Sequence, residues 1–181
     1  LKNFRMLTTS PIIGRLIFNT LFLNILFIAA ETLVGVILAL LLNELTGKFF
    51  KRITQSFMFL PYFIGWPVVG VMLMSFIDYD MGVFNQILAA SGLERVAFTN
   101  EPAMWPALLT LIRIWKNAGA QCIIYLAALS SIDPQLYEAA AIDGASRWQR
   151  MRLISLPFLT ATVFLMILLA IGRIFYGDVG M

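Results

Sequence analysis

The feature that most constrains this chain is a set of long apolar stretches that are free of charged residues. Residues 53–77 and 153–172 contain no Asp, Glu, Lys or Arg, and residues 16–43 contain only Glu31. A helix that crosses a bilayer needs roughly 20 apolar residues. A fourth stretch, residues 117–132, reaches that length if it is extended back by two residues. We therefore predict four membrane spans, at about 17–43, 53–77, 107–130 and 155–175.

The composition leaves too few polar residues to cover these stretches in water. Of the 181 residues, 60% are hydrophobic and 13% are charged, whereas about 25% of the residues of an average soluble domain are charged. The mean hydropathy is +0.86. A soluble protein of this size must cover itself with polar side chains, so lipid must cover this one. The sequence predicts an all-α membrane protein, a polytopic transmembrane helical bundle that forms one domain over residues 1–181.

Several classes of function are disfavoured by what the chain lacks. It has no histidine and one cysteine, Cys122, so the usual zinc sites, Ser-His-Asp triads and a disulfide within the chain are excluded. It has no Gly-rich Lys-Ser/Thr phosphate loop, so we expect it to bind no nucleotide. The net charge is +3, but the basic residues form short clusters and no basic stripe. We therefore expect no nucleic acid as a partner.

The connections between the predicted spans differ in charge. Residues 44–52 are short and basic, residues 78–103 are longer and acidic, and residues 130–154 carry three arginines. Because positively charged loops tend to stay in the cytoplasm, this pattern favours the first and third connections inside and the second outside. The three basic residues before the first span then lie outside and nearly cancel the difference. The charge pattern alone does not fix the topology.

The third connection contains two successive helix starts. Asp133 followed by Pro134 is typical of a helix N-terminus, because the carboxylate caps free amides and proline has no amide hydrogen to lose. This short helix is expected to end near Gly144. Ser146 and Gln149 have the spacing of a capping box and open the next helix. The sequence predicts a helix, a glycine turn and a second helix at the membrane surface.

This connection resembles the EAA loop of importer-type ABC transporter permeases. All seven positions that define the motif are met within twenty residues. The extended form of the motif resembles that of the carbohydrate-type permeases, in particular the polysaccharide-type subgroup, and the resemblance covers most of the chain. The matching residues are Glu138, Ala139, Ala140, Gly144, Ile154, Leu156 and Pro157, extended by Tyr137, Asp143 and Ala145.

The resemblance implies that the loop at 131–157 lies in the cytoplasm and that its first helix couples an ATPase to the spans. Docking in a groove needs anchors at helical spacing, and these are Leu136, Ala139, Ala140 and Asp143. The implied partners are cytoplasmic ABC ATPase subunits, which bind ATP and Mg²⁺, a second permease subunit, an external solute-binding protein and membrane lipid. The chain itself would be no enzyme and would bind no cofactor. It would serve import of an oligosaccharide or polysaccharide-derived substrate by alternating access, in a bacterial plasma membrane.

A cytoplasmic loop at 131–157 also sets the expected topology. Residues 44–52 are then cytoplasmic, and residues 1–15, 78–103 and 176–181 are external. A chain that starts outside without a signal-peptide pattern implies a further span upstream. We therefore expect a fragment of a longer permease.

Polar residues in the predicted spans are candidates for a translocation pathway, because ionisable groups inside a membrane usually face the bundle interior. Asn24 and Glu31 lie near one face of the first span, although Glu31 has an equally good structural explanation as a partner of Arg113. Aromatic side chains and hydrogen-bonding groups commonly hold sugars, and a cationic side chain would bind the carboxylate of an acidic saccharide. The alternative is an interfacial aromatic belt with cations that snorkel outward. The remaining candidates for the pathway are Tyr62, Trp66, Arg113, Lys116 and Asn117.

Other functions remain open. An ABC permease for a peptide, an amino acid or a metal would share the loop. A channel or an ion-coupled secondary transporter would use Glu31 as its ion site and would work without an ATPase. A membrane-embedded enzyme is disfavoured, because the chain has no histidine and few intramembrane carboxylates that could pair. Gly65, Gly70 and Gly119 are interpreted as sites of close helix packing.

Overall fold

The computed structural model describes residues 11–45 and 47–174, and every regular element in these ranges is helical. This confirms the all-α fold class. The elements are α2 (Pro11–Glu44), α3 (Lys48–Phe59), the 3-10 turn η1 (Leu60–Phe63), α4 (Trp66–Ile77), α5 (Val83–Ala90), the 3-10 turn η2 (Phe98–Asn100), α6 (Trp105–Leu129), α7 (Pro134–Ile142), α8 (Arg147–Arg150), the π-helical turn η3 (Met151–Ser155) and α9 (Leu156–Ile171).

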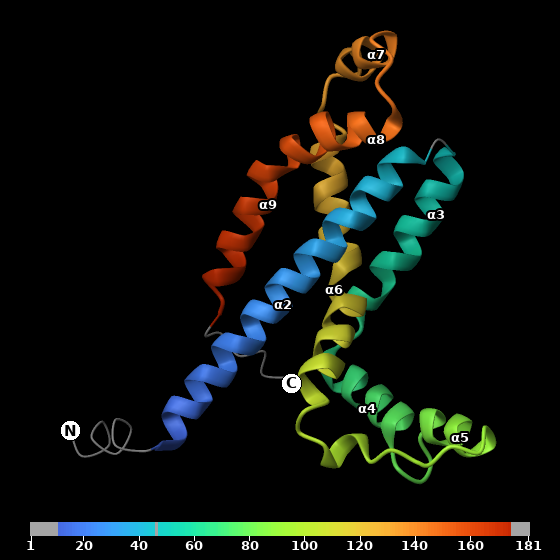
Figure 1. Cartoon of the computed structure of the whole chain (residues 1–181), viewed down its shortest axis with the longest axis vertical. Coiled ribbons are helices and arrows are strands. Elements are labelled where there is room, and N and C mark those ends of the chain that lie inside the picture. The colour runs from blue at the N-terminus through green and yellow to red at the C-terminus, as the bar shows by residue number, and fades with distance from the viewer. Residues whose placement is uncertain (1–10, 46, 175–181) are drawn as a thin grey trace.

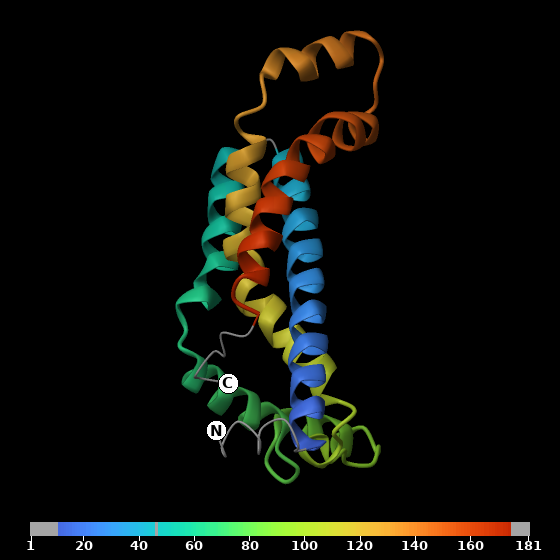
Figure 2. The same ribbon diagram turned by 90° about the vertical axis from the view of Figure 1, so that its left-hand side faces the viewer.

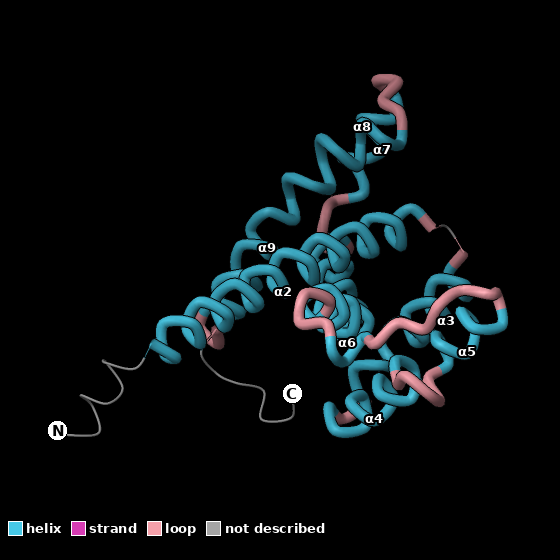
Figure 3. The backbone as a smooth tube through the Cα atoms, turned by 60° about the horizontal axis from the view of Figure 1, so that its bottom comes forward, coloured by secondary structure: helices cyan, strands magenta, loops and turns pink. Residues whose placement is uncertain are grey.

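Four helices form an elongated bundle. Figure 1 shows α2, α3, α6 and α9 along the long axis, with α7 and α8 at one end and α4 and α5 at the other. Helix α6 is central, because it packs against α2, α3 and α9 (Figures 2 and 3). The last turn of α2 and the first turn of α3 lie at the same end as α7 and α8 (Figure 1). The predictions for residues 1–10 and 175–181 lie outside the described residues.

The segment expected to form a span over residues 53–77 is not one straight helix. Helices α3 with η1 and α4 meet at an angle of 97°. Pro61 lies in η1, Ile64 and Gly65 have extended backbones, and Pro67 lies in the first turn of α4. A proline inside a helix removes a hydrogen bond and clashes with the preceding turn. The two prolines on either side of Gly65 therefore end one helix and start another.

Two of the described helices are long and apolar enough to cross a membrane. They cover residues 12–44 and residues 147–171, and a bent pair over residues 48–77 becomes a third if it counts as one span. Helix α6 occupies the span expected at 107–130 but is not among them. It carries a row of polar residues that faces the other helices. The surfaces of α2 and α9 are rich in exposed Leu, Ile and Phe side chains, as expected for helices that lipid covers.

The buried core lies at the end of the bundle that carries α7 and α8. Ala39 and Leu42 from α2 meet Tyr125 and Leu129 from α6, and Leu159 from α9 completes the cluster with no exposed surface. Full burial of one such side chain contributes about 1.5–3 kcal/mol. This core joins the three helices at one level and leaves their other halves to enclose a cavity.

Of the three glycines expected at close helix contacts, only Gly119 lies at one within the described residues. A Cβ atom on Gly119 would overlap the backbone carbonyl of Met58 in α3, whereas nothing described lies within 4 Å of such an atom on Gly70, and Gly65 has only Pro67 at an ordinary distance. Gly65 and Gly70 therefore make no close helix contact within the described residues. Gly119 lets α3 and α6 touch.

We expect Gly119→Ala to lower the stability of the full-length protein by about 1–3 kcal/mol, because an added methyl group must push two backbones apart. Gly70→Ala is the matched control, since it makes the same change in a helix with open space and gains helix propensity of about 0.5–1 kcal/mol. The measurement is thermal unfolding of the purified proteins in detergent. Equal midpoints for the two variants would contradict the close-contact assignment.

Candidate functional site

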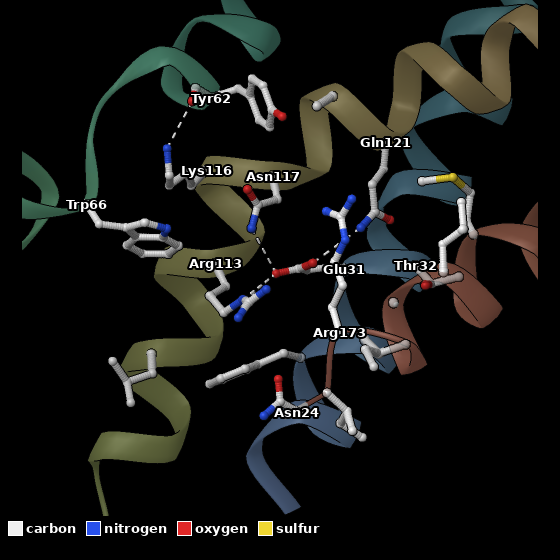
Figure 4. A pocket seen from close by; sticks show the side chains of 18 of the residues that line it. Asn24, Glu31, Thr32, Tyr62, Trp66, Arg113, Lys116, Asn117, Gln121 and Arg173 are labelled. Atoms are coloured by element: carbon white, nitrogen blue, oxygen red, sulfur yellow. Dashed lines mark hydrogen bonds and ion pairs between the residues drawn. The ribbon is translucent and has the colours of Figure 1, made fainter. Parts of the chain in front are cut away.

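A large cavity lies between the helices on the side of the core away from α7 and α8. Its volume is about 1420 Å³, and α2, η1, the start of α4, α6 and the end of α9 line it. Figure 4 shows its polar side chains converging from these elements. All seven residues proposed from the sequence for a translocation pathway line this cavity: Asn24, Glu31, Tyr62, Trp66, Arg113, Lys116 and Asn117.

The centre of the cavity wall is a buried ion pair between α2 and α6. Arg113 donates from Nε to Glu31 Oε1 at 2.7 Å, and the two side chains are 20% and 8% exposed. Asn117 Nδ2 donates to the same oxygen at 3.0 Å, and Gln121 Nε2 donates to Glu31 Oε2 at 3.2 Å (Figure 4). Both carboxylate oxygens therefore have partners. The pairing of Glu31 with Arg113 considered from the sequence is present, and the pair also faces the cavity.

The spacing of residues in α6 creates this arrangement. Arg113, Asn117 and Gln121 are separated by four residues each, so they share one face of the helix. Gly35 follows Glu31 by one turn of α2, and a Cβ atom there would lie 3.1 Å from both Gln121 Cβ and the Tyr125 ring. The absence of that atom lets α6 approach α2 closely enough for the glutamate to reach all three donors.

Lys116 occupies a second position, at the break between η1 and α4. Its ammonium donates to the carbonyl oxygens of Tyr62, at 3.0 Å, and Ile64, and it lies 5.7 Å from the Tyr62 ring centre and 5.3 Å from the Trp66 ring centre. The side chain is 6% exposed. The alternative in which this cation snorkels outward therefore does not hold. Non-helical backbone at membrane depth is tolerated where it lines a cavity, and Lys116 supplies donors for the carbonyls that the break leaves free.

The sequence interpretation missed several polar residues of the cavity, among them Gln121 and Arg173. Gln121 was not proposed, although its spacing after Arg113 and Asn117 is a usable signal. Arg173 also lines the cavity, from the turn after α9. No comparable sequence signal points to the Ile64 carbonyl, because its role depends on Lys116 lying nearby in space.

The loop at 131–157 forms a second candidate site at the opposite end of the bundle (Figure 1). Asp133 caps α7 by accepting from Gln135 N at 2.9 Å, and the Ser146–Gln149 capping box opens α8. Both local predictions are confirmed. Helix α7 ends in a Schellman motif: Gly144 has φ +79°, and the Ala145 amide donates to Ala140 O at 2.9 Å.

A side-chain hydrogen bond joins the loop to the bundle, whereas most of α7 is exposed. Tyr137 Oη and Ser155 Oγ are 2.8 Å apart, and Ser155 is buried. Leu136, Glu138, Ala139 and Asp143 are exposed on α7, whereas Ala140 is half-buried. Of the other motif residues, Gly144, Leu156 and Pro157 are exposed, and Ala145 and Ile154 are half-buried.

An apolar surface accompanies the exposed loop. Ile142 is 87% exposed and Trp148 is 65% exposed. Large apolar side chains exposed on a projecting loop are typical of a protein-binding surface.

Comparison with known proteins finds one family and several relatives that this chain resembles over most of its length. Residues 31–180 match the family described as binding-protein-dependent transport system inner membrane component. The chain is 38% identical over 172 residues to the polygalacturonan/rhamnogalacturonan transport system permease protein YteP of Bacillus subtilis (strain 168), covering 95% of this chain and 54% of YteP. The chain spans about half the length of the curated relatives it matches.

Two solved structures are also similar. One is a bacterial ABC transporter involved in the import of the acidic polysaccharide alginate, with a TM-score of 0.91 and 36% identity over 96% of this chain and 61% of that one. The other is a bacterial alginate ABC transporter in complex with an alginate pentasaccharide-bound periplasmic protein, with a TM-score of 0.89 and 36% identity over 94% of this chain and 59% of that one.

Proposed function

We propose that this chain, which belongs to the family of binding-protein-dependent transport system inner membrane components, forms part of the permease subunit of an ATP-driven carbohydrate importer. The observation that carries the proposal is the combination of a polar cavity and an exposed coupling loop on one set of helices. The cavity supplies the groups that a translocated sugar needs, and the loop supplies a surface for an ATPase.

The continuity of the helix after the loop supports mechanical coupling. Residues 147–171 form one uninterrupted helical segment through α8, η3 and α9. Its far end contributes Met166, Leu169 and Ala170 to the cavity wall. A displacement of the loop by a closing ATPase is therefore transmitted along a rigid element to the cavity. In the proposed cycle this opens the pathway outward to receive substrate, and the reverse movement releases it into the cytoplasm.

The carbohydrate class is supported by the lining and by the relatives. Trp66 and Tyr62 offer aromatic faces, and Asn117 and Gln121 offer amide groups that bond to a sugar or to Glu31. Of the similar proteins described above, one belongs to a polygalacturonan/rhamnogalacturonan transport system and two are alginate transporters. The proposed partners are cytoplasmic ABC ATPases, a second permease subunit and, as in one similar structure, a solute-binding protein outside the membrane.

Reconstitution of the full-length protein with its partners into proteoliposomes tests this function. We expect uptake of an oligosaccharide delivered by the solute-binding protein to require ATP hydrolysis, with at least a tenfold loss when ATP is replaced by a non-hydrolysable analogue. An ionophore that collapses proton and sodium gradients should leave the uptake unchanged. Uptake that persists without ATPase subunits and disappears with the ionophore would instead show an ion-coupled transporter that uses Glu31.

A further inference from the structure

The charges of the cavity are unbalanced. Among the described residues that line it, Glu31 is the one carboxylate, and Arg113, Lys116 and Arg173 are cations. Glu31 is already paired with Arg113. Neither ion pair found within the described residues includes Lys116. A cation in a confined, partly desolvated space attracts anions more strongly than it does in bulk water.

Two hydrogen bonds of the Lys116 ammonium are made within the chain, and one of its N–H donors remains without a partner among the described residues. An ammonium group has three N–H donors, and two of them are directed to the carbonyls of Tyr62 and Ile64. These carbonyls carry partial negative charge but cannot neutralise a full positive charge. The third N–H has no partner among the described residues. The side chain is 6% exposed and lines the cavity, so the ammonium is largely desolvated and meets the cavity with what remains exposed.

The aromatic rings of Trp66 and Tyr62 lie next to the Lys116 ammonium. Trp66 and Tyr62 contact it through their faces, and Figure 4 shows both rings beside Lys116 at the cavity. Aromatic faces also pack against the C–H groups of sugar rings. A sugar that stacks here would place its exocyclic C6 substituent near the ammonium, where a carboxylate gains a charge-assisted hydrogen bond and a neutral group does not.

We propose that Lys116, with Trp66 and Tyr62, forms a subsite for the carboxylate of an acidic sugar residue and determines a preference for uronic-acid oligosaccharides. The inference rests on the proposed function, because it assigns the substrate class of the same cavity. It differs from a purely structural role, in which Lys116 only caps the carbonyls at the helix break. A structural cap would affect neutral and acidic ligands alike.

The test is equilibrium binding of two matched trisaccharides to the full-length permease complex in detergent, without the solute-binding protein. One probe is a radiolabelled uronic-acid trisaccharide, and the other is its fully methyl-esterified, neutral form. We expect the wild type to bind the acid at least tenfold more tightly than the ester. Lys116→Met should reduce this ratio to about one, and Lys116→Arg should keep it within about threefold of the wild type.

Arg95→Gln is the control for a general loss of positive charge, because Arg95 is an exposed cation in the connection after α5 and does not line the cavity. It should leave the ratio unchanged. Equal binding of both probes to the wild type would overturn the subsite, as would a ratio unaffected by Lys116→Met or a loss of both probes to the same extent. The ATP-dependent uptake assay on the same preparation decides separately whether the transport function stands.

Discussion

Replacing Glu31 with glutamine should lower the free energy of unfolding of the full-length protein by about 3 kcal/mol, because removal of one partner of a buried ion pair leaves the other charge uncompensated. Arg113 would remain largely buried against α2, facing an amide in place of a carboxylate. The Asn117 and Gln121 amides would also lose a charged acceptor. The lost stability is that of the contact between α2 and α6.

Two further variants make this prediction specific. The double variant Glu31→Gln with Arg113→Met should recover much of the lost stability, since it removes both charges. Asp80→Asn breaks the exposed pair with Arg95, which has a separation of 3.5 Å and side chains that are 40% and 79% exposed, and should cost less than about 1 kcal/mol. The midpoint of denaturant-induced unfolding in detergent measures all three. A Glu31→Gln loss no larger than that of Asp80→Asn would show that the buried pair contributes little.

Gly144→Glu should abolish ATP-coupled uptake, with a loss of at least tenfold, while the permease is still inserted. Gly144 has φ +79°, and a side chain in this backbone conformation costs about 1–2 kcal/mol. The strain and the new carboxylate would change the turn that sets α7 relative to α8. Glu138→Lys, which reverses an exposed charge on α7, should act in the same direction. Both variants should either hydrolyse ATP without uptake or fail to retain ATPase subunits on purification.

Gly92 is the matched control for Gly144. It has φ +76° and ends α5 in the same motif, with the Leu93 amide donating to Leu88 O at 2.9 Å. No described atom lies within 4 Å of a Cβ added at either glycine. Gly92→Glu therefore introduces the same local strain at the opposite end of the molecule, and it should retain the ATPase subunits. If Gly92→Glu loses them to the same extent, or if Gly144→Glu retains wild-type uptake, the coupling role of the loop is refuted.

Predictions from short sequence spacings were accurate. The Asp133 cap, the Ser146–Gln149 capping box and the turn at Gly144 all form as expected, since each depends on atoms within about five residues along the chain. The span over residues 53–77 stays a prediction, because the bent pair of α3 and α4 is one span only if its two halves are counted together. Absence of charge does not indicate the bend, whereas Pro61 and Pro67 are sequence signals for a break.

For the candidate pathway, too, the sequence indicated which residues to consider and the tertiary structure indicated how they are arranged. Hydropathy and helical spacing placed the seven polar candidates in the correct elements but left two interpretations of each open. Three-dimensional packing brought them to one cavity. It paired Glu31 with a residue 82 positions away and placed Lys116 beside a carbonyl 52 positions away.

The sequence alone determined the all-α class, the apolar character of the long helices and the local geometry of the loop, because composition, periodicity and capping act over a few neighbouring residues. Only the tertiary structure decided that α3 and α4 bend by 97° and that the free carbonyls at the bend meet Lys116. The physical reason is that a buried charge or an unpaired carbonyl must find a partner in space, and the chain order does not specify which distant helix supplies it.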